Sequence, residues 1–318
     1  MAPFIQLKKK ARPTGHRAKG RSTPALNPER PPLAHGYLQS PDGTRLFYSV
    51  EGAGKPLVFC YGLVCSSLHW TYQIEHFCHG YQAAWMDYRG HGNSDTPKDM
   101  NSLTVETLAQ DLFLFLDEIG IKEAVFLGHS MGVNTVLEVY RQQPERVLGM
   151  VLANGTAKRP LETLLFNNNV LEPVFELARM LHRRSPALLN KIWTFQKGNP
   201  LARALIQFGG FNPHLTAPED VQLYVDQMAK LDPSTLLHLI ASYDSYDATS
   251  WLHEIKVPTL LIAGERDKIT PLAQQELLHQ LIPGSRLEVI KHGSHCPQMD
   301  LPDLVNVKIE QFLKELKY

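Results

Sequence analysis

Five residues near the middle of the chain have the spacing of a nucleophilic serine site. Gly128-His129-Ser130-Met131-Gly132 reads Gly-x-Ser-x-Gly, and it follows an apolar run at 124–127 and precedes an amphipathic segment. In a strand–turn–helix context, the two glycines let the backbone turn sharply and hold the serine hydroxyl exposed at the end of the strand. Without that context the same pentapeptide is a glycine-rich turn with a passive serine. The context therefore predicts that Ser130 is a nucleophile.

A serine hydroxyl needs a general base, and the base needs a carboxylate to orient it. Asp267 follows a strand expected at 259–263, and His295 follows a strand expected at 287–290. Because the carboxyl ends of parallel strands meet at one edge of a sheet, both side chains are expected at the edge that carries Ser130. Their order along the chain, Ser then Asp then His, is the order expected with this serine motif. The sequence thus predicts a Ser130-Asp267-His295 triad.

Each of the two partners has a rival nearby. Glu265 lies closer to the strand end than Asp267, and His292 precedes His295 in the last loop. At the end of the preceding strand, where a carboxylate would also reach the site, the chain has Asn154, which carries no charge. Asp267 and His295 are the predicted pair, and Glu265 and His292 remain the alternatives.

The segments around these residues alternate between expected strands and helices. Residues 34–40 and 44–51 predict a hairpin around Pro41-Asp42-Gly43. Short apolar runs, typical of strands buried on both faces, follow at 57–60, 83–86, 124–127, 149–153, 259–263 and 287–290. Amphipathic helices are expected at 105–119, 132–143, 273–281 and 304–316. This alternation predicts an α/β fold with a mostly parallel central sheet flanked by helices.

The alternation stops between residues 158 and 250. Helices are expected there at 171–184, 186–196, 218–230 and 234–243, with prolines near the joints. We therefore expect a helical cap at 158–250, inserted into a core formed by 34–157 and 251–318. The aromatic residues of the cap either line a pocket for an apolar group or pack the cap on the core; they are Phe166, Phe175, Trp193, Phe195, Phe208, Phe211 and Tyr224.

The net charge of the chain is zero, but it is unevenly distributed. Residues 1–30 carry eight Lys or Arg and one Glu, a net charge of +7, which leaves −7 for the rest. With six prolines as well, residues 1–33 are expected to form a flexible basic tail. A solvated extension is favoured, weak attachment to an anionic membrane or to nucleic acid is an alternative, and the prolines disfavour a targeting helix. No aromatic residues alternate with the basic ones to suggest base stacking, so no nucleic acid is required as partner.

The composition is that of an ordinary soluble protein, with 43% hydrophobic and 20% charged residues. There is no apolar run long enough to span a bilayer and no secretory leader. Four scattered cysteines indicate free thiols in a reducing compartment, so a cytoplasmic protein is expected, with any membrane contact peripheral. No metal is expected, because the one cluster of metal-ligand types, at 75–79, lacks a second ligand pair. The oligomeric state stays open.

With these motifs the chain resembles the α/β-hydrolase superfamily over residues 34–318. Residues 87–95, Asp-Tyr-Arg-Gly-His-Gly-Asn-Ser-Asp, are similar to the family's D-x-R-G-x-G-x-S segment, where Arg89 and Asp95 shape the loop. Residues 264–271 are similar to its acid loop. The resemblance implies the α/β-hydrolase fold, and it places the helical insertion where such enzymes carry a cap.

The resemblance also implies an oxyanion hole made of two backbone N–H groups. One belongs to Met131, directly after the nucleophile, and the other to Leu63, in the loop after the strand at 57–60. Tyr61-Gly62 stands where the family usually has His-Gly. The donor is a backbone group, so the resemblance implies a working loop whose side-chain anchor differs.

The activity implied is that of a serine hydrolase acting on a small-molecule carboxylic ester. Ser130 attacks the carbonyl, His295 takes the proton and Asp267 holds the imidazole, so the mechanism needs neither metal nor organic cofactor. The same triad supports acyl transfer, C–C bond hydrolysis, lactone opening, amide cleavage and perhydrolysis. Serine at this position argues against haloalkane dehalogenase and epoxide hydrolase chemistry, for which the resemblance would require aspartate. A non-catalytic ligand sensor is the alternative from another functional class.

Overall fold

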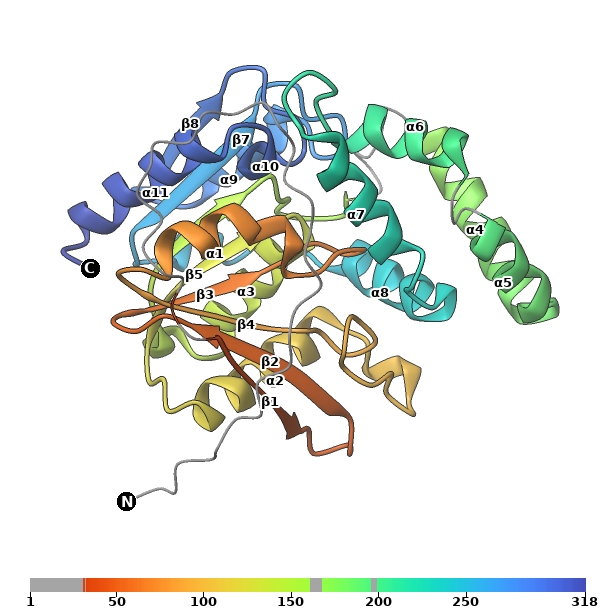
Figure 1. Ribbon diagram of the computed structural model, residues 1–318, viewed down its shortest axis with the longest axis horizontal. Coiled ribbons are helices and arrows are strands. Elements are labelled where there is room, and N and C mark those ends of the chain that lie inside the picture. Colours follow the sequence, from red (N-terminus) through yellow and green to blue (C-terminus); the bar gives the residue numbers. More distant parts are fainter. Residues whose placement is uncertain (1–30, 32, 161–167, 196–198) are drawn as a thin grey trace.

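A mostly parallel sheet runs through the middle of the protein (Figure 1). The structure is a computed structural model that describes residues 31, 33–160, 168–195 and 199–318. Within these residues the sheet has eight strands in the order β1-β2-β4-β3-β5-β6-β7-β8. Their bounds are Leu33–Gln39 (β1), Arg45–Glu51 (β2), Pro56–Cys60 (β3), Gln82–Met86 (β4), Ala124–His129 (β5), Val147–Ala153 (β6), Thr259–Gly264 (β7) and Arg286–Ile290 (β8).

Only β2 runs against its neighbours: it pairs antiparallel with β1 and with β4. All other neighbouring strands are parallel. The predicted hairpin and the predicted mostly parallel α/β sheet are confirmed.

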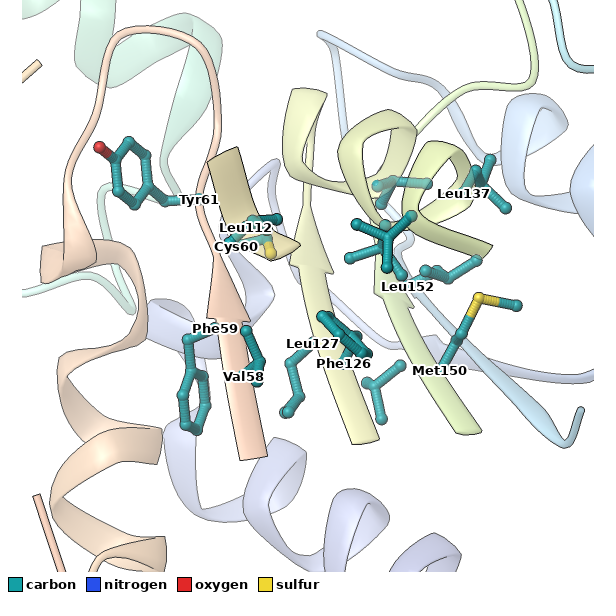
Figure 2. Close-up of a cluster of buried hydrophobic side chains, with 14 of the residues drawn as sticks. Val58, Phe59, Cys60, Tyr61, Leu112, Phe126, Leu127, Leu137, Met150 and Leu152 are labelled. Atoms are coloured by element: carbon teal, nitrogen blue, oxygen red, sulfur yellow. The ribbon is translucent and has the colours of Figure 1, made fainter. Parts of the chain in front are cut away.

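The central parallel strands β3, β5, β6 and β7 are mainly apolar because helices cover both faces of the sheet, whereas β8 at the edge includes Arg286 and Glu288. Every residue of β5 and of β7 is buried. Figure 2 shows side chains of three adjacent strands, among them Val58, Phe126 and Met150, packed with residues of the covering helices such as Leu137. This packing fixes where each strand ends, and therefore where the loops that follow it are placed.

Two groups of helices cover the sheet. α1 (Thr71–Phe77) packs with α11 (Pro302–Glu315), and α10 (Pro297–Asp300) contacts both. α2 (Val105–Glu118) packs with α3 (Met131–Gln142), which also contacts β5 and β6, while α9 (Leu272–Leu281) contacts β7 and β8. Thr104 begins α2 by accepting a hydrogen bond from the Thr107 N–H, so this helix starts where its capping sequence predicts.

Five helices of the described chain lie between β6 and β7. They are α4 (Asn168–Arg184), α5 (Pro186–Phe195), α6 (Pro200–Gly210), α7 (Pro218–Met228) and α8 (Pro233–Ser245). α4 and α5 project away from the sheet, whereas α7 and α8 lie beside it (Figure 1). At the base, the Ala248 N–H donates to the Ala157 carbonyl at 2.9 Å, so the two connections to the core lie side by side. α6 has no counterpart among the helices expected from the sequence.

The predicted basic tail lies outside the described residues, apart from Pro31 and Leu33, and Leu33 already begins β1. In the described ranges, no helix is long and apolar enough to cross a membrane.

Candidate active site

Ser130 is the single residue between β5 and α3. Its backbone has φ 55° and ψ −124°, a strained conformation for a residue with a side chain. Two hydrogen bonds hold it: its N–H donates to the Ala153 carbonyl at 3.0 Å, and its carbonyl accepts from the Val133 N–H at 2.9 Å. A Cβ on Gly132 would collide with the Cys60 backbone, so the tight turn requires glycine there. The sharp turn leaves the Ser130 hydroxyl at the wall of a cavity.

This cavity has a volume of about 350 Å³ and lies between the core and the cap. Its lining comes from the loop after β3, from the cap and from the loops after β7 and β8. The lining residues are Gly62, Leu63, Val64, His69, Ser130, Leu205, Ile206, Gly209, Gly210, Phe211, Tyr224, Tyr243, Ile269, Thr270, His295 and Cys296. Most of these side chains are apolar, so the cavity is suited to an apolar group beside a few polar contacts.

The carboxylate of Asp267 contacts the ring of His295, which lines the cavity. Asp267 Oδ2 lies 2.9 Å from His295 Nδ1, and both side chains are buried. Asp267 Oδ1 accepts the backbone N–H groups of Ile269 at 2.7 Å and of Thr270 at 3.0 Å, which fixes the carboxylate. A carboxylate only accepts, so Nδ1 carries the imidazole proton and Nε2 of the neutral ring is free to take a proton. The structure thus brings Ser130 and His295 to one cavity, with Asp267 directly behind His295.

The two rival residues lie elsewhere. Glu265 and His292 have side chains that are 43% and 49% exposed, and Glu265 Oε2 lies 3.7 Å from His292 Nδ1. Glu265 also accepts the His292 N–H at 2.9 Å, and this hydrogen bond lowers the pKa of Glu265. Neither residue lines the cavity, so they form a surface pair outside the site.

Asn154, at the third position considered for the acid, connects the two catalytic loops. Its Nδ2 donates to the carbonyls of Ser294 and His295, both at 2.9 Å. Its Oδ1 accepts the N–H of Gly264 at 2.9 Å. An uncharged amide suits this position because the role needs donors and an acceptor together, which a carboxylate does not offer.

The loop that carries Leu63 is anchored by three buried side chains. Tyr61, which replaces the family's usual histidine, accepts the Tyr88 N–H on its hydroxyl at 2.6 Å. His91 Nε2 lies 2.6 Å from the Leu63 carbonyl, and Trp70 donates to the Cys60 carbonyl at 3.0 Å. Burial raises the pKa of Tyr61 well above its ordinary value, so its hydroxyl stays protonated. This is the different anchor that the sequence implies.

The backbone of the same loop lies directly against the nucleophile. A Cβ added to Gly62 would lie 3.0 Å from the Ser130 Cβ. Leu63 follows Gly62 and lines the cavity, and Met131 follows Ser130. Both residues that carry the predicted oxyanion donors therefore lie close to Ser130.

Arg89 shapes the segment 87–95 and takes no part in the cavity. Its guanidinium, 1% exposed, donates to both Asp111 carboxylate oxygens at 2.6 Å and to Asp42 at 2.8 Å. Asp95 lies near the surface, 3.4 Å from Arg45. Because Tyr88 precedes Arg89, this network also fixes the backbone that anchors Tyr61.

The end of α6 is tied to both loops that carry the predicted base and acid. Ser294 donates to the Gly210 carbonyl at 3.1 Å, and Asn212 donates to the His292 carbonyl at 2.8 Å. Lys268, next to Asp267, donates to the Phe208 carbonyl at 3.1 Å. The cap is thus bonded to the site rather than merely placed over it.

Of the two roles left open for the aromatic residues of the cap, lining a pocket applies to only some of them in the described part of the chain. Phe211 and Tyr224 line the cavity, whereas Phe208 is 68% exposed, beneath the Lys268 ammonium. Phe175 and Trp193 do not line it either, and aliphatic side chains from α6 take their place. Phe166 and the side chain of Phe195 lie outside the described residues.

Sequence reasoning missed two polar side chains of the cavity. His69 lies in a short helical turn, Ser67–Trp70, and Tyr243 lies on α8. Neither follows a strand, and neither belongs to a recognisable motif. They reach the cavity through packing between segments that are distant in the sequence, so no local signal could have identified them.

Comparisons with known proteins agree with the fold. A protein from Azorhizobium caulinodans named as a carbamate hydrolase is 26% identical over 285 residues, which cover 90% of this chain and 99% of that protein. Bifunctional epoxide hydrolase 2 of Sus scrofa is 25% identical over 327 residues, which cover 92% of this chain but only 58% of that longer protein. The solved structure of a thermophilic esterase from Thermogutta terrifontis superposes with a TM-score of 0.73 at 21% identity, covering 89% of this chain and 99% of the esterase.

The family model described as the alpha/beta hydrolase fold matches residues 55–302, which include the serine turn, the acid loop and the histidine loop. The chain belongs to the α/β-hydrolase fold family.

Proposed function

We propose that this protein is a serine hydrolase that cleaves a carboxylic ester of small to moderate size through an acyl-enzyme. One observation carries the proposal: the strained Ser130 shares a cavity with His295, whose Nδ1 lies 2.9 Å from the buried Asp267. A structural serine does not need a strained backbone, a neighbouring imidazole and a carboxylate behind that imidazole.

The reaction follows from the roles of these groups. Ser130 Oγ attacks the ester carbonyl while His295 Nε2 takes the hydroxyl proton, and Asp267 stabilises the imidazolium. The N–H groups of Leu63 and Met131 bind the oxyanion, and each such donor stabilises the transition state by about 3 kcal/mol. His295 then protonates the leaving alcohol. A water molecule, deprotonated by His295, attacks the acyl-enzyme and releases the acid and free Ser130.

The cavity sets the size and character of the substrate. At about 350 Å³ it lies at the small end of ligand pockets, and Leu205, Ile206 and Phe211 give it apolar walls. These features support an ester with one apolar group of modest length.

Carbamate hydrolysis is the second candidate, because the relative named as a carbamate hydrolase aligns with almost the whole chain. The same attack by Ser130 would form a carbamoyl-enzyme. Epoxide opening is less well supported despite the relative of that name, because the turn after β5 holds Ser130 and not the aspartate that the resemblance requires.

The test compares wild type with Ser130→Ala on nitrophenyl esters of increasing acyl length and on a nitrophenyl carbamate. We expect Ser130→Ala to lose at least about a thousandfold in kcat/KM, and wild type to prefer short to medium acyl chains. Ser245→Ala, at the exposed end of α8, is the matched control and is expected to retain full activity. Equal rates for wild type and Ser130→Ala would remove Ser130 from the mechanism, and preference for the carbamate would select the second candidate.

A further inference from the structure

Three histidines form a chain of hydrogen bonds at the base of the cavity. His129 Nε2 lies 2.7 Å from the backbone carbonyl oxygen of His295, and His129 Nδ1 lies 3.1 Å from His69 Nδ1. His129 is completely buried and His69 nearly so. The proposed mechanism uses the His295 ring and gives no role to the other two rings.

The proton positions on His129 and His69 can be assigned by starting from the His295 carbonyl. Burial lowers the pKa of His69 to about 3 and that of His129 well below its ordinary value, so both rings are neutral near pH 7. The His295 carbonyl can only accept, so His129 Nε2 carries the proton and His129 Nδ1 is an acceptor. His69 Nδ1 must therefore donate to it. A neutral imidazole has one N–H, so His69 Nε2 is left as a hydrogen-bond acceptor.

This acceptor is held still at the wall of the cavity. The His69 ring stacks on Tyr224 at 5.2 Å between centroids and meets the His129 ring edge-on at 4.6 Å. His69 and Cys296 both line the cavity, and His69 Nε2 lies 3.9 Å from the Cys296 sulfur. A thiol at that distance is a weak donor. Among the residues that the structure describes, the Nε2 lone pair therefore has no strong hydrogen-bond donor, and the cavity around it is mainly apolar.

We propose that His69 Nε2 is a substrate-binding group, and that the preferred substrate carries an O–H or N–H donor close to its ester. This inference rests on the proposed ester hydrolysis and narrows its substrate class to esters such as hydroxy esters. An ester without a donor leaves the acceptor unsatisfied in a cavity from which it displaces water, and so binds less well.

Two pairs of esters test the proposal, and within each pair a hydroxyl replaces a methyl group. Ethyl 3-hydroxybutyrate and ethyl isovalerate differ in the acyl group. The esters 2-hydroxyethyl butyrate and propyl butyrate differ in the alcohol group. The readout is the ratio of kcat/KM for the hydroxyl ester to kcat/KM for its methyl partner, measured by acid release. This ratio is independent of the amount of folded enzyme, so partial unfolding of a variant does not affect it.

Two substitutions of His69 separate binding from a structural role. An asparagine amide reaches the position of Nδ1 and keeps the link to His129, but it has no acceptor at the position of Nε2. A glutamine, one methylene longer, places an acceptor near Nε2 and gives up the link to His129. We expect His69→Asn to lower the ratio about tenfold in one ester pair, mainly through KM, and His69→Gln to keep it within about twofold of wild type.

Three results would overturn the inference. An unchanged ratio for His69→Asn in both pairs would mean that Nε2 does not meet the substrate. A larger fall for His69→Gln than for His69→Asn would assign His69 the structural role of supporting His129. If wild type hydrolyses none of the four esters, the proposed ester hydrolysis itself fails. Turnover of the esters without a preference for the hydroxyl would instead leave ester hydrolysis standing and overturn only the role given to His69 Nε2.

Discussion

The edge of the sheet that carries Ser130 and the cap above it are built in contrasting ways. At the edge, buried polar side chains such as Asn154, Arg89 and Asp267 each make several hydrogen bonds. Many of the exposed large apolar side chains in the described chain lie instead on α4–α7: Val174, Leu177, Met180, Leu188, Ile192, Leu201, Leu205, Phe208 and Leu223.

The contrast separates two tasks of the molecule. Several hydrogen bonds hold the predicted triad residues in place, and the strained backbone of Ser130 depends on such support. The cap lines the cavity with a few residues of α6, α7 and α8 and leaves much of its remaining apolar surface exposed. Chemistry should therefore be sensitive to the core edge, and the outer cap surface should tolerate change.

The largest effect is expected at the histidine loop. His295→Ala should lower kcat/KM at least about a thousandfold, because His295 is the proposed general base for Ser130. His292→Ala, three residues away on the surface, should stay within about twofold of wild type. Steady-state kinetics on a nitrophenyl ester measures both, and the reverse order would reassign the base.

The next effect concerns stability at the core edge. Arg89→Met leaves Asp111 buried and unpaired, which should lower the free energy of unfolding by about 3–5 kcal/mol. Arg45→Met removes an exposed pair with Asp95 and a surface cation–π contact with the Tyr37 ring, and should cost less than about 1 kcal/mol. Urea unfolding measures both values, and equal losses would show that the Arg89 network does not support the edge.

The buried histidines should make the core sensitive to acid. Because the folded pKa of His69 is lowered to about 3, the unfolded chain binds more protons, so stability is complete above about pH 6.5 and is lost as the pH falls. Between about pH 6.5 and about pH 3, His69 contributes a loss of about 1.4 kcal/mol per pH unit. His69→Asn should reduce the slope of unfolding free energy against pH by this amount. An unchanged slope would contradict the neutral state assumed for the ring.

The smallest effect is expected on the cap surface. Leu201, 66% exposed on α6, should be replaceable by alanine with a change of less than about 0.5 kcal/mol in unfolding free energy. The same substitution at the fully buried Leu137 of α3 should cost about 2–5 kcal/mol. A large loss for Leu201→Ala would show that the outer cap face is covered in solution.

The core could be predicted from the sequence because its signals are local. Apolar runs followed by Gly128, Asp267 or Gly293 mark strand ends, and parallel strands bring those ends together. The cap was harder. Asn199 caps α6 and Pro200 begins it, but Gly209 and Gly210 lie within its last turn, where glycine disfavours helix, and the segment was not expected to be helical.

The roles of two buried polar residues, Asn154 and His69, could not be predicted from the sequence because they depend on packing. Asn154 was considered only as a missing carboxylate, although it links the two catalytic loops. His69 gains its role from contacts with Tyr224 and His129, which no spacing along the chain reveals.

The bonds between the end of α6 and the catalytic loops have a mechanical consequence. A bound molecule too large for the cavity would push α6 outward and strain the Gly210–Ser294 and Phe208–Lys268 hydrogen bonds. Ser294 precedes His295 and Lys268 follows Asp267 in the chain, so the displacement would reach both residues. We therefore expect such a molecule to disturb the predicted alignment of His295 with Ser130. Turnover of an oversized ester should then be slow even when the ester enters the cavity.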